Sequence, residues 1–351
     1  MSRFVRGVVE WVRPDVVVPT TIPLLERGLR PNDILDEAPL VADVPAHPGD
    51  ATFVGQHLVV TAPSGITWVG SGPTVDLDGS AGPVAALGDR ALVAVEGRGL
   101  VAVDRSGSCE VVRDDPLLRQ NVSALTADER GTVWACVASS RFAGTEWADA
   151  LLAGDRTGSL VRVDAGGATV VVDGLAWPAG CEVGDGRVYV ALSLEHRIEW
   201  RAIDEPGSSH PLVGPLPGYP GAIRRRGDRL VVAMPYLRNR MTELILSDGA
   251  VRDDMASSMP RETWLVPVPV SVGSVRDPLQ FGQQRVMGVS KPWAPPRSYG
   301  LVIEVDSSGR VTQSWHSRHG GRRHGISGVA PAGERIVVVA RGVGEVVEVA
   351  A

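Results

Sequence analysis

The sequence has few cysteines, no long apolar run and no excess of positive charge. Cys109, Cys136 and Cys181 are the three cysteines of a 351-residue chain. They are odd in number, far apart and outside any C-x-x-C pair, which excludes a disulfide framework and a zinc knuckle. We interpret them as buried apolar side chains in a reducing compartment.

The charge balance excludes two large classes of partner. Lys and Arg number 35 against 41 Asp and Glu, so the sequence offers no basic face for a nucleic acid or an anionic membrane. In the first 21 residues, Glu10, Arg13 and Asp15 interrupt the apolar residues, which leaves no signal-peptide core and no membrane span. We therefore expect a cytoplasmic protein whose partner is a small molecule.

Motifs for nucleotide cofactors are also missing. No G-x-G-x-x-G, P-loop or G-x-S-x-G stands in a strand-turn-helix context. Amphipathic helical periodicity is nearly absent, and the only plausible short helix lies in residues 139–158. We therefore expect no cofactor.

Short Val-rich runs make up most of the chain, such as "HLVVTA", "RALVAVEG", "GRVYVALS" and "ERIVVVAR". A Gly or Asp turn precedes each run, and a small polar turn and a second strand follow almost every one. This pattern predicts an all-β fold.

The strand pairs recur at irregular spacings of a few tens of residues, which is typical of a β-propeller. We predict six four-stranded antiparallel blades, with inner strands near Thr52, Val84, Ala124, Cys181, Ile223 and Ser327. The segment "APLVADVP" (38–45) is placed to supply an outer strand to the last blade and so close the ring. Residues 1–37 would form an N-terminal extension and residues 38–351 the propeller, with insertions 139–158 and 236–298 as possible lids.

The run from Asp155 to Ala233, which contains "GLAWPAGCEVGDGRVYVALSLEHRIEW" and "LPGYPGAIRRRGDRLVVA", resembles a known family. It is similar to the strictosidine synthase-like branch of the superfamily that also holds gluconolactonases and paraoxonases, and the resemblance extends from about Asp43 to the C-terminus. It implies a six-bladed propeller.

The resemblance also implies where a metal would bind. Calcium-dependent members hold one ion in the central channel by Glu, Asn and Asp side chains at the starts of inner strands. The resemblance puts residues without side-chain oxygens at three of these four places, and Asn121 or Ser123 at the fourth; the three places hold Gly49, Ala179, and the pair Gly221 and Ala222. We therefore expect no metal site.

Strictosidine synthase itself carries "GGAE" where this chain has "AGCE", Ala179 to Glu182. That enzyme condenses an amine with an aldehyde without a metal, through a glutamate near the start of its last inner strand. The resemblance places Ser327 there, so strictosidine formation is not implied.

Two residues are candidates for proton transfer. His324 stands in the unusual segment "SWHSRHGGRRHGIS" (314–327), where a neighbouring arginine, Arg323, could hold an anionic group of the substrate. The alternative is a solvated basic loop. Glu182 could point into the channel and have a raised pKa there, or could form a structural ion pair with Arg224.

Further residues are candidates for substrate binding. Asp50, Asn121, Ser123 and Ser327 stand near the starts of inner strands, where they would orient a substrate or make ordinary turn contacts. Trp147 and Trp293 lie in the insertions and suit a flat, apolar or aromatic substrate, or else they anchor the loops.

From these features we expect a metal-independent small-molecule enzyme of specialised metabolism, with a cyclisation or condensation as its acid–base step. One alternative is a lactonase or esterase that uses a His or a carboxylate as base. Another is a propeller that binds a ligand without converting it.

Overall fold

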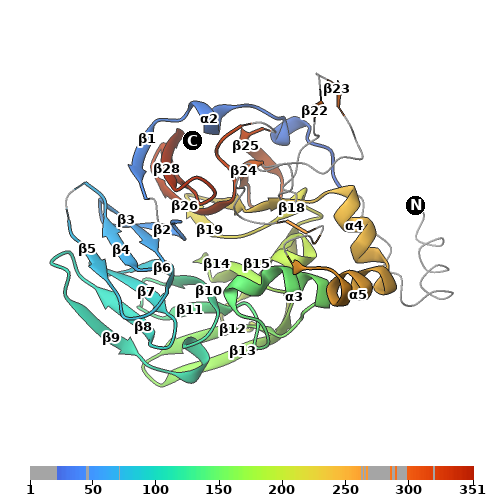
Figure 1. The fold of residues 1–351 in the computed structure, drawn as a ribbon. Helices are drawn as coiled ribbons and strands as arrows, with labels where there is room; N and C mark the ends of the chain where they lie inside the picture. The colour runs from blue at the N-terminus through green and yellow to red at the C-terminus, as the bar shows by residue number, and fades with distance from the viewer. Residues whose placement is uncertain are drawn as a thin grey trace.

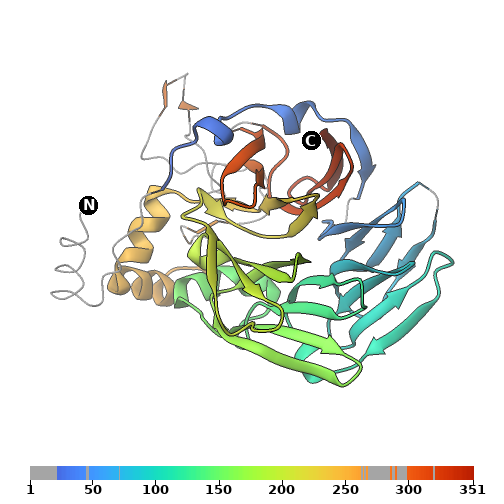
Figure 2. The ribbon, with the colours of Figure 1, turned by 180° about the vertical axis from the view of Figure 1, so that it is seen from behind.

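The computed structural model describes residues 22–44, 47–70, 72–261, 264, 266–267, 285–286, 289–290, 299–318 and 321–351. These residues form six four-stranded antiparallel sheets arranged in a ring (Figure 1, and from behind in Figure 2). The prediction of a six-bladed β-propeller is therefore confirmed. Each of the six inner strands includes or borders the position expected from the sequence.

The first three blades follow one another along the chain. Blade 1 contains β2 (Ala51–Val54), β3 (His57–Ala62), β4 (Gly65–Trp68) and β5 (Thr74–Asp76); blade 2 contains β6 (Ala81–Leu87), β7 (Arg90–Val95), β8 (Gly99–Val103) and β9 (Cys109–Arg113); blade 3 contains β10 (Val122–Ala127), β11 (Val133–Val137), β12 (Gly158–Asp164) and β13 (Gly167–Leu175). Short 3-10 turns precede β10, lie before the helix of the first insertion and follow β15, at η2 (Pro116–Leu118), η3 (Gly144–Glu146) and η4 (Ser193–Glu195).

The last three blades include the long insertion and the N-terminal strand. Blade 4 contains β14 (Pro178–Gly184), β15 (Arg187–Leu192), β16 (Arg197–Ala202) and β17 (His210–Val213); blade 5 contains β19 (Ile223–Arg226), β20 (Arg229–Met234), β24 (Gly300–Val305) and β25 (Val311–Ser317); blade 6 contains β26 (Ile326–Ala332), β27 (Arg335–Ala340), β28 (Glu345–Ala350) and β1 (Leu40–Asp43). Two small ribbons pair β18 (Gly218–Tyr219) with β21 (Tyr236–Leu237) and β22 (Arg285–Val286) with β23 (Val289–Ser290).

The second strand of every blade is apolar along nearly its whole length because neighbouring blades cover both of its faces. In β7 and β27, for example, every residue after the first is buried. Outer strands differ: β9 has exposed or half-buried residues throughout. The Val-rich runs of the sequence thus mark the strands that are sandwiched between blades.

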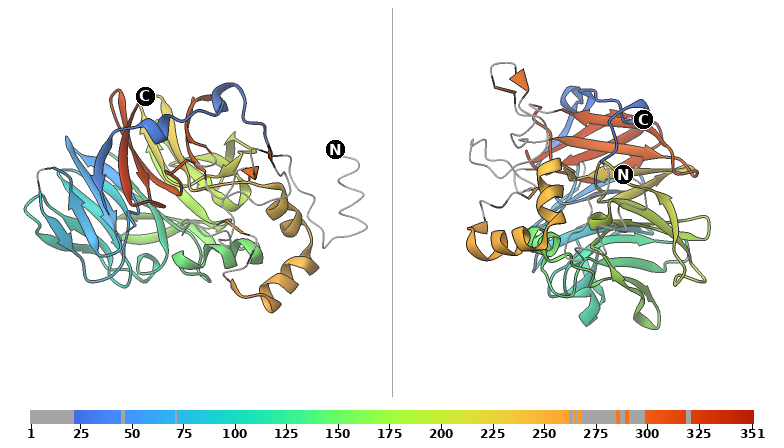
Figure 3. Two further views of the ribbon diagram at one scale, coloured as in Figure 1. Left: turned by 45° about the horizontal axis from the view of Figure 1, so that its top comes forward. Right: turned by 90° about the vertical axis from the view of Figure 1, so that its right-hand side faces the viewer.

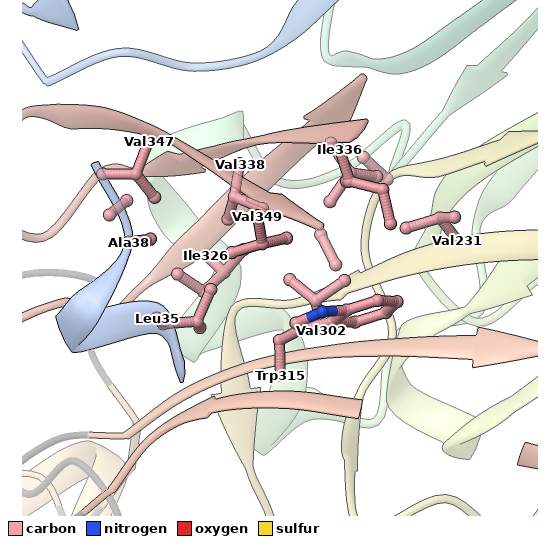
Figure 4. Packing of buried hydrophobic residues seen from close by; sticks show 14 residues of the cluster. Leu35, Ala38, Val231, Val302, Trp315, Ile326, Ile336, Val338, Val347 and Val349 are labelled. Atoms are coloured by element: carbon pink, nitrogen blue, oxygen red, sulfur yellow. The ribbon is translucent and has the colours of Figure 1, made fainter. Parts of the chain in front are cut away.

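The N-terminal part of the described chain wraps around the last two blades. After η1 (Arg27–Leu29) and α2 (Ile34–Glu37), strand β1 pairs antiparallel with β28. Leu35 and Ala38 pack onto the apolar core of blade 6, which also contains Ile326 and Val347 (Figure 4). The fourth strand of the last blade therefore comes from the beginning of the propeller.

Helices occur in both insertions, and the expectation of one short helix was wrong. The first insertion forms α3 (Trp147–Ala153), as predicted, but the second forms α4 (Arg240–Ser247) and α5 (Gly249–Ser258). The Asn239 and Asp248 side chains accept hydrogen bonds from the first backbone amides of α4 and α5. Within the described residues, no helix is long and apolar enough to cross a membrane.

Both insertions leave the propeller at the same end. Each joins the second strand of a blade to the third, and in an antiparallel sheet the second strand ends where the first begins. The insertions therefore stand where the inner strands start. Their helices project from one side of the ring (Figure 3) and share one apolar cluster, which includes Leu151 of α3, Ile245 of α4 and Met255 of α5.

Candidate functional site

The inner strands place six equivalent side chains around the axis of the propeller. In each blade, one residue of the inner strand pairs with the second or third residue of the second strand. These six residues define a set that we call the axial ring: Thr52, Ala85, Thr126, Glu182, Arg224 and Ala330. The residue before each member is fully buried between blades, from Ala51 in blade 1 to Val329 in blade 6. Ala85 and Ala330 of the axial ring pack in apolar clusters between neighbouring blades, whereas Arg224 reaches across the channel. The charged members of the ring are Glu182 and Arg224.

Arg224 reaches across the channel from blade 5 to blades 1 and 2. Its Nη2 donates to Asp50 Oδ2 at 2.6 Å and to the Val84 carbonyl at 2.9 Å, while Nη1 donates to the Ile223 carbonyl. Both members of the Asp50–Arg224 ion pair are buried. A low-dielectric surrounding strengthens such a pair, but only if the remaining hydrogen-bonding positions are also satisfied.

Asp50 has these further partners. Its Oδ1 accepts from the Ala51 amide at 2.8 Å, and its Oδ2 also accepts from the Val84 amide at 3.2 Å. A side chain at Gly328 of blade 6 would lie 2.9 Å from Asp50 Oδ1, so glycine is needed there. Asp50 thus makes turn contacts and forms the buried ion pair of the channel, and its predicted contact with substrate stays a prediction.

Glu182 of blade 4 is the second carboxylate of the channel, and it is half-buried. Burial raises the pKa of Glu182 to about 7, because desolvation disfavours the charged carboxylate more than the nearby Arg224, Thr126 and the Arg225 amide favour it. A carboxyl group with a pKa near neutrality exchanges protons readily at physiological pH. Glu182 is therefore suited to act as an acid or a base.

Calcium, which the resemblance led us to consider, does not fit this donor set. A divalent cation needs several converging oxygens, whereas Gly49, Ala179, Gly221 and Ala222 at the ligand places have no side-chain oxygen. At the fourth place, Asn121 and Ser123 donate to backbone carbonyls. Among the described residues, no group of three or more His, Cys, Asp or Glu side chains could hold a metal ion.

Aromatic side chains gather beneath the helices of the insertions. Trp147 of α3 lies against Tyr236 with ring centroids 4.4 Å apart, and against the edge of Tyr219 at 5.1 Å. The ring of His196 contacts the same tyrosine edge-on at 4.4 Å. We call these four residues the aromatic cluster. Trp147 was predicted to bind substrate, and it lies here together with three residues that sequence reasoning missed.

A buried ion pair flanks the aromatic cluster. Arg238 and Glu243 form two hydrogen bonds of 2.8 Å, and Glu243 Oε1 lies 3.7 Å from His196 Nε2. Burial lowers the pKa of His196 to about 3, so its imidazole is neutral at physiological pH. Tyr219 ends β18 shortly before the inner strand β19, so the fragment "GYP" was the available signal.

The structure places His324 and Glu182, the two candidates for proton transfer, apart from each other. His324 precedes β26, and its ring packs against Gly342 in the turn between β27 and β28. Its Nδ1 lies 3.0 Å from the Arg322 carbonyl, and burial lowers its pKa. Glu182 lies within β14, two blades away. In the described part of the chain no contact joins the two.

Arg323 holds the N-terminal segment and is not placed to hold a substrate anion. Its Nε donates to Glu345 at 2.8 Å, and its Nη1 donates to the carbonyls of Leu35 and Ala38, each at 2.6 Å. The alternative of a solvated basic loop holds for Arg318 and Arg322, which are exposed, but not for His316, Arg323 and His324, which are buried.

The three remaining polar candidates make contacts between blades or with an insertion. Asn121 donates to the Phe142 carbonyl at 2.9 Å and so anchors the first insertion. Ser123 donates to the carbonyl of Pro178 in blade 4 at 2.5 Å, and Ser327 donates to that of Pro48 at 3.3 Å. Their structural roles are clear, and their predicted contacts with substrate stay predictions.

The remaining expectations concern Trp293, His319 and the three cysteines. Trp293 lies outside the described residues, as does His319. Cys136 and Cys181 are buried, as interpreted, but Cys109 is exposed on the outer strand β9. That strand has no blade beyond it to cover its side chain.

No family model matches the chain, and no curated protein matches it. Solved structures of similar fold include a gluconolactonase from Xanthomonas campestris, with a TM-score of 0.54, 12% identity and coverage of 89% of this chain and 88% of that one. A regucalcin from Agrobacterium tumefaciens, described as a calcium-binding protein, matches with a TM-score of 0.53, 12% identity and coverage of 89% and 92%. A luciferin-regenerating enzyme matches with a TM-score of 0.51, 14% identity and coverage of 91% and 94%.

At these identities the likeness shows the fold alone. It agrees with the six-bladed propeller that the resemblance implies. The strictosidine synthase-like branch and the cyclisation or condensation reaction have no support from these structures and stay predictions.

Proposed function

We propose that this six-bladed propeller is a hydrolase of the lactonase or esterase type that works without a metal, with Glu182 as its general base. The observation that carries the proposal is the half-buried Glu182 carboxyl in the axial ring, with a pKa raised to about 7 beside the fixed cation of Arg224. The fold adds a reason to test lactones first, because one of the similar structures is a gluconolactonase.

The proposed reaction uses two residues of the channel. Glu182 takes a proton from a water molecule whose oxygen attacks the ester carbonyl carbon, and the bond between that carbon and the ring oxygen or alkoxy oxygen then breaks. The leaving oxygen takes up the proton from Glu182, which restores the base. The positive charge of Arg224 favours the negative charge that develops on the carbonyl oxygen.

The test is hydrolysis of a panel of sugar lactones and aryl acetates by the purified protein. We expect Glu182→Gln to lower kcat by about a hundredfold or more, since general-base catalysis contributes roughly that much. Glu348→Gln, on the outer side of blade 6, is the matched control and should keep full activity. Activity of the wild type should rise with pH through about 7, because the base must be ionised.

Addition of calcium and of a chelator separates this proposal from a metal-dependent reaction. We expect neither to change the rate. A calcium-dependent rate, or full activity in Glu182→Gln, would contradict the proposed role. Binding of a lactone without turnover would favour a ligand-binding propeller.

A further inference from the structure

Two of the three cysteines face each other across the boundary between blades 3 and 4. Cys136 belongs to β11 and Cys181 to β14, and both are fully buried in one apolar cluster. The Cys181 Sγ lies 3.5 Å from the Trp134 carbonyl of β11. The Cys136 Sγ lies 3.9 Å from the Gly180 carbonyl of β14. Each sulfur therefore reaches the backbone of the strand that carries the other cysteine.

The two thiols also contact each other, on strands that lie close together. A hydrogen bond with Cys181 and, next, burial raise the pKa of Cys136. Cα atoms of β11 and β14 come within 8 Å of one another, and strands at this spacing can bring two facing cysteines into the range of a disulfide. The spacing of the cysteines in the sequence excludes a disulfide framework, but a single bridge between blades depends only on this contact.

The position of Cys181 is occupied by an aliphatic residue in every other blade. Cys181 directly precedes a member of the axial ring, and its counterparts in the other five blades are all fully buried: Ala51, Val84, Leu125, Ile223 and Val329. Aliphatic side chains thus satisfy the packing at this position. The sulfur of Cys181 is the exception, and it lies opposite the other buried cysteine of the chain.

The cation of Arg224 acts on the side of Cys181. Burial would lower the pKa of this guanidinium, but interactions with Asp50, Glu182 and Cys181 raise it. The guanidinium is already held by Asp50 Oδ2 and by two backbone carbonyls. A disulfide carries no charge, so a bond between the two sulfurs leaves the buried Asp50–Arg224 pair intact.

We propose that Cys136 and Cys181 form a disulfide that joins blade 3 to blade 4 when the chain folds in the presence of a small disulfide oxidant such as oxidised glutathione. One protein thiol loses its proton and attacks a sulfur of the oxidant, which releases one glutathione thiolate. The other protein thiol loses its proton and attacks the protein sulfur of the mixed disulfide, which releases the second. Two protein thiols are oxidised, one glutathione disulfide is reduced, and the two glutathione thiolates take up the protons. The bond does not depend on Glu182 or on hydrolysis.

Burial decides when this bond forms. The thiolate is the reactive species, and a fully buried thiol such as that of Cys136, whose pKa is raised, stays protonated and out of reach of the oxidant. The unfolded chain exposes both thiols. The bond should therefore form during folding, whereas the folded, reduced protein should resist the same oxidant. Cys109, which is exposed on β9, reports whether the oxidant reaches the folded protein.

The test is to refold the reduced, urea-unfolded chain with oxidised glutathione and to map its peptides without reduction. We expect one cross-link, between Cys136 and Cys181. The melting temperature should rise by about 5 °C above that of the reduced protein, because the bond closes a loop of about 45 residues in the unfolded chain. The folded, reduced protein should gain glutathione at Cys109 and nowhere else. Free thiols at both buried positions after refolding, or a cross-link to Cys109, would overturn the proposal.

Cys136→Ala separates the disulfide from other effects of the oxidant. The variant should form no cross-link and melt at the same temperature with and without oxidant. Cys109→Ala is the matched control, because it removes the exposed cysteine and keeps the buried pair, and it should show the cross-link and the full shift in melting temperature. The peptide map of the wild type decides the question even if Cys136→Ala fails to fold. A cross-linked wild type that melts no higher than the reduced protein would show that the bond strains the fold, against the proposal.

Discussion

At the scale of single residues, burial decides which ion pairs contribute to the stability of this protein. Asp50 and Arg224 are both buried and share hydrogen bonds with the backbone of blade 2. The neighbouring Arg225 pairs with Asp185 at 2.8 Å, but Asp185 is largely exposed. Water screens the second pair and hardly reaches the first.

Asp50→Asn should therefore destabilise the protein strongly. The variant leaves the Arg224 guanidinium buried without its counter-charge, which typically costs about 3–5 kcal/mol of unfolding free energy. The control Asp185→Asn removes an exposed pair and should cost about 1 kcal/mol or less. Urea unfolding of both variants measures the difference. Similar losses of unfolding free energy in the two variants would show that the buried channel pair stabilises the protein no more than the exposed pair does.

At the scale of elements, the contact between the N-terminal segment and β25 contains a titratable group. His316 is fully buried, with Nδ1 at 2.8 Å from the Tyr299 hydroxyl and Nε2 at 2.7 Å from Ser314 Oγ. Ser314 in turn donates to the Gly28 carbonyl, so it accepts from Nε2–H. The imidazole is thus held neutral between β25 and the segment that covers it.

The stability of the protein should depend on pH through His316. Burial lowers its pKa from 6.5 to about 4, so the unfolded chain binds the proton more tightly than the folded protein does. The contribution of neutral His316 to the free energy of unfolding is complete above about pH 6.5 and is lost as the pH falls toward 4. Urea unfolding at pH 7 and at pH 4.5 measures how much free energy of unfolding each protein loses between the two pH values. This loss should be smaller for His316→Gln than for the wild type.

The comparison with this variant is needed because Glu182 acts in the opposite direction. Its pKa is raised in the folded protein, so it destabilises the fold as the pH rises through about 4.5 to 7. The difference between wild type and His316→Gln removes this shared contribution. Equal losses in both proteins would exclude His316 as the titrating group.

At the scale of the whole molecule, the ring is closed by contacts between residues far apart in the sequence. Strand β1 pairs with β28, and Arg323 joins Glu345 of that strand to the carbonyls of Leu35 and Ala38 just before β1. A closed ring leaves no blade with an unpaired face. The last blade is therefore the one on which closure depends.

Arg323→Met should loosen this closure before the rest of the fold. We expect amide hydrogen exchange to become about tenfold faster or more in residues 40–43 and 345–350, with little change in blades 2 and 3. Arg335→Met is the control, because Arg335 pairs with Glu348 at an exposed position of the same blade. Uniform acceleration across all blades would mean that closure and global unfolding are one event.

Much of the fold could be predicted from the sequence because strand patterns are local. Strands such as β7 and β27 show as continuous apolar runs, and the turns before them show as Gly and Asp. The short helices α4 and α5 were missed because their polar and apolar residues do not form a long periodic stripe, and their caps are single residues.

The candidate site was predictable only in part. The sequence by itself determined that Glu182 stands on an inner strand and that Gly221 and Ala222 offer no side-chain oxygen to a metal. Only the tertiary structure decided that Arg224 pairs with Asp50, 174 positions away, and that Trp147 meets Tyr219 and Tyr236. These contacts depend on the closure of six blades around one axis, which sets distances that no local pattern of residues encodes.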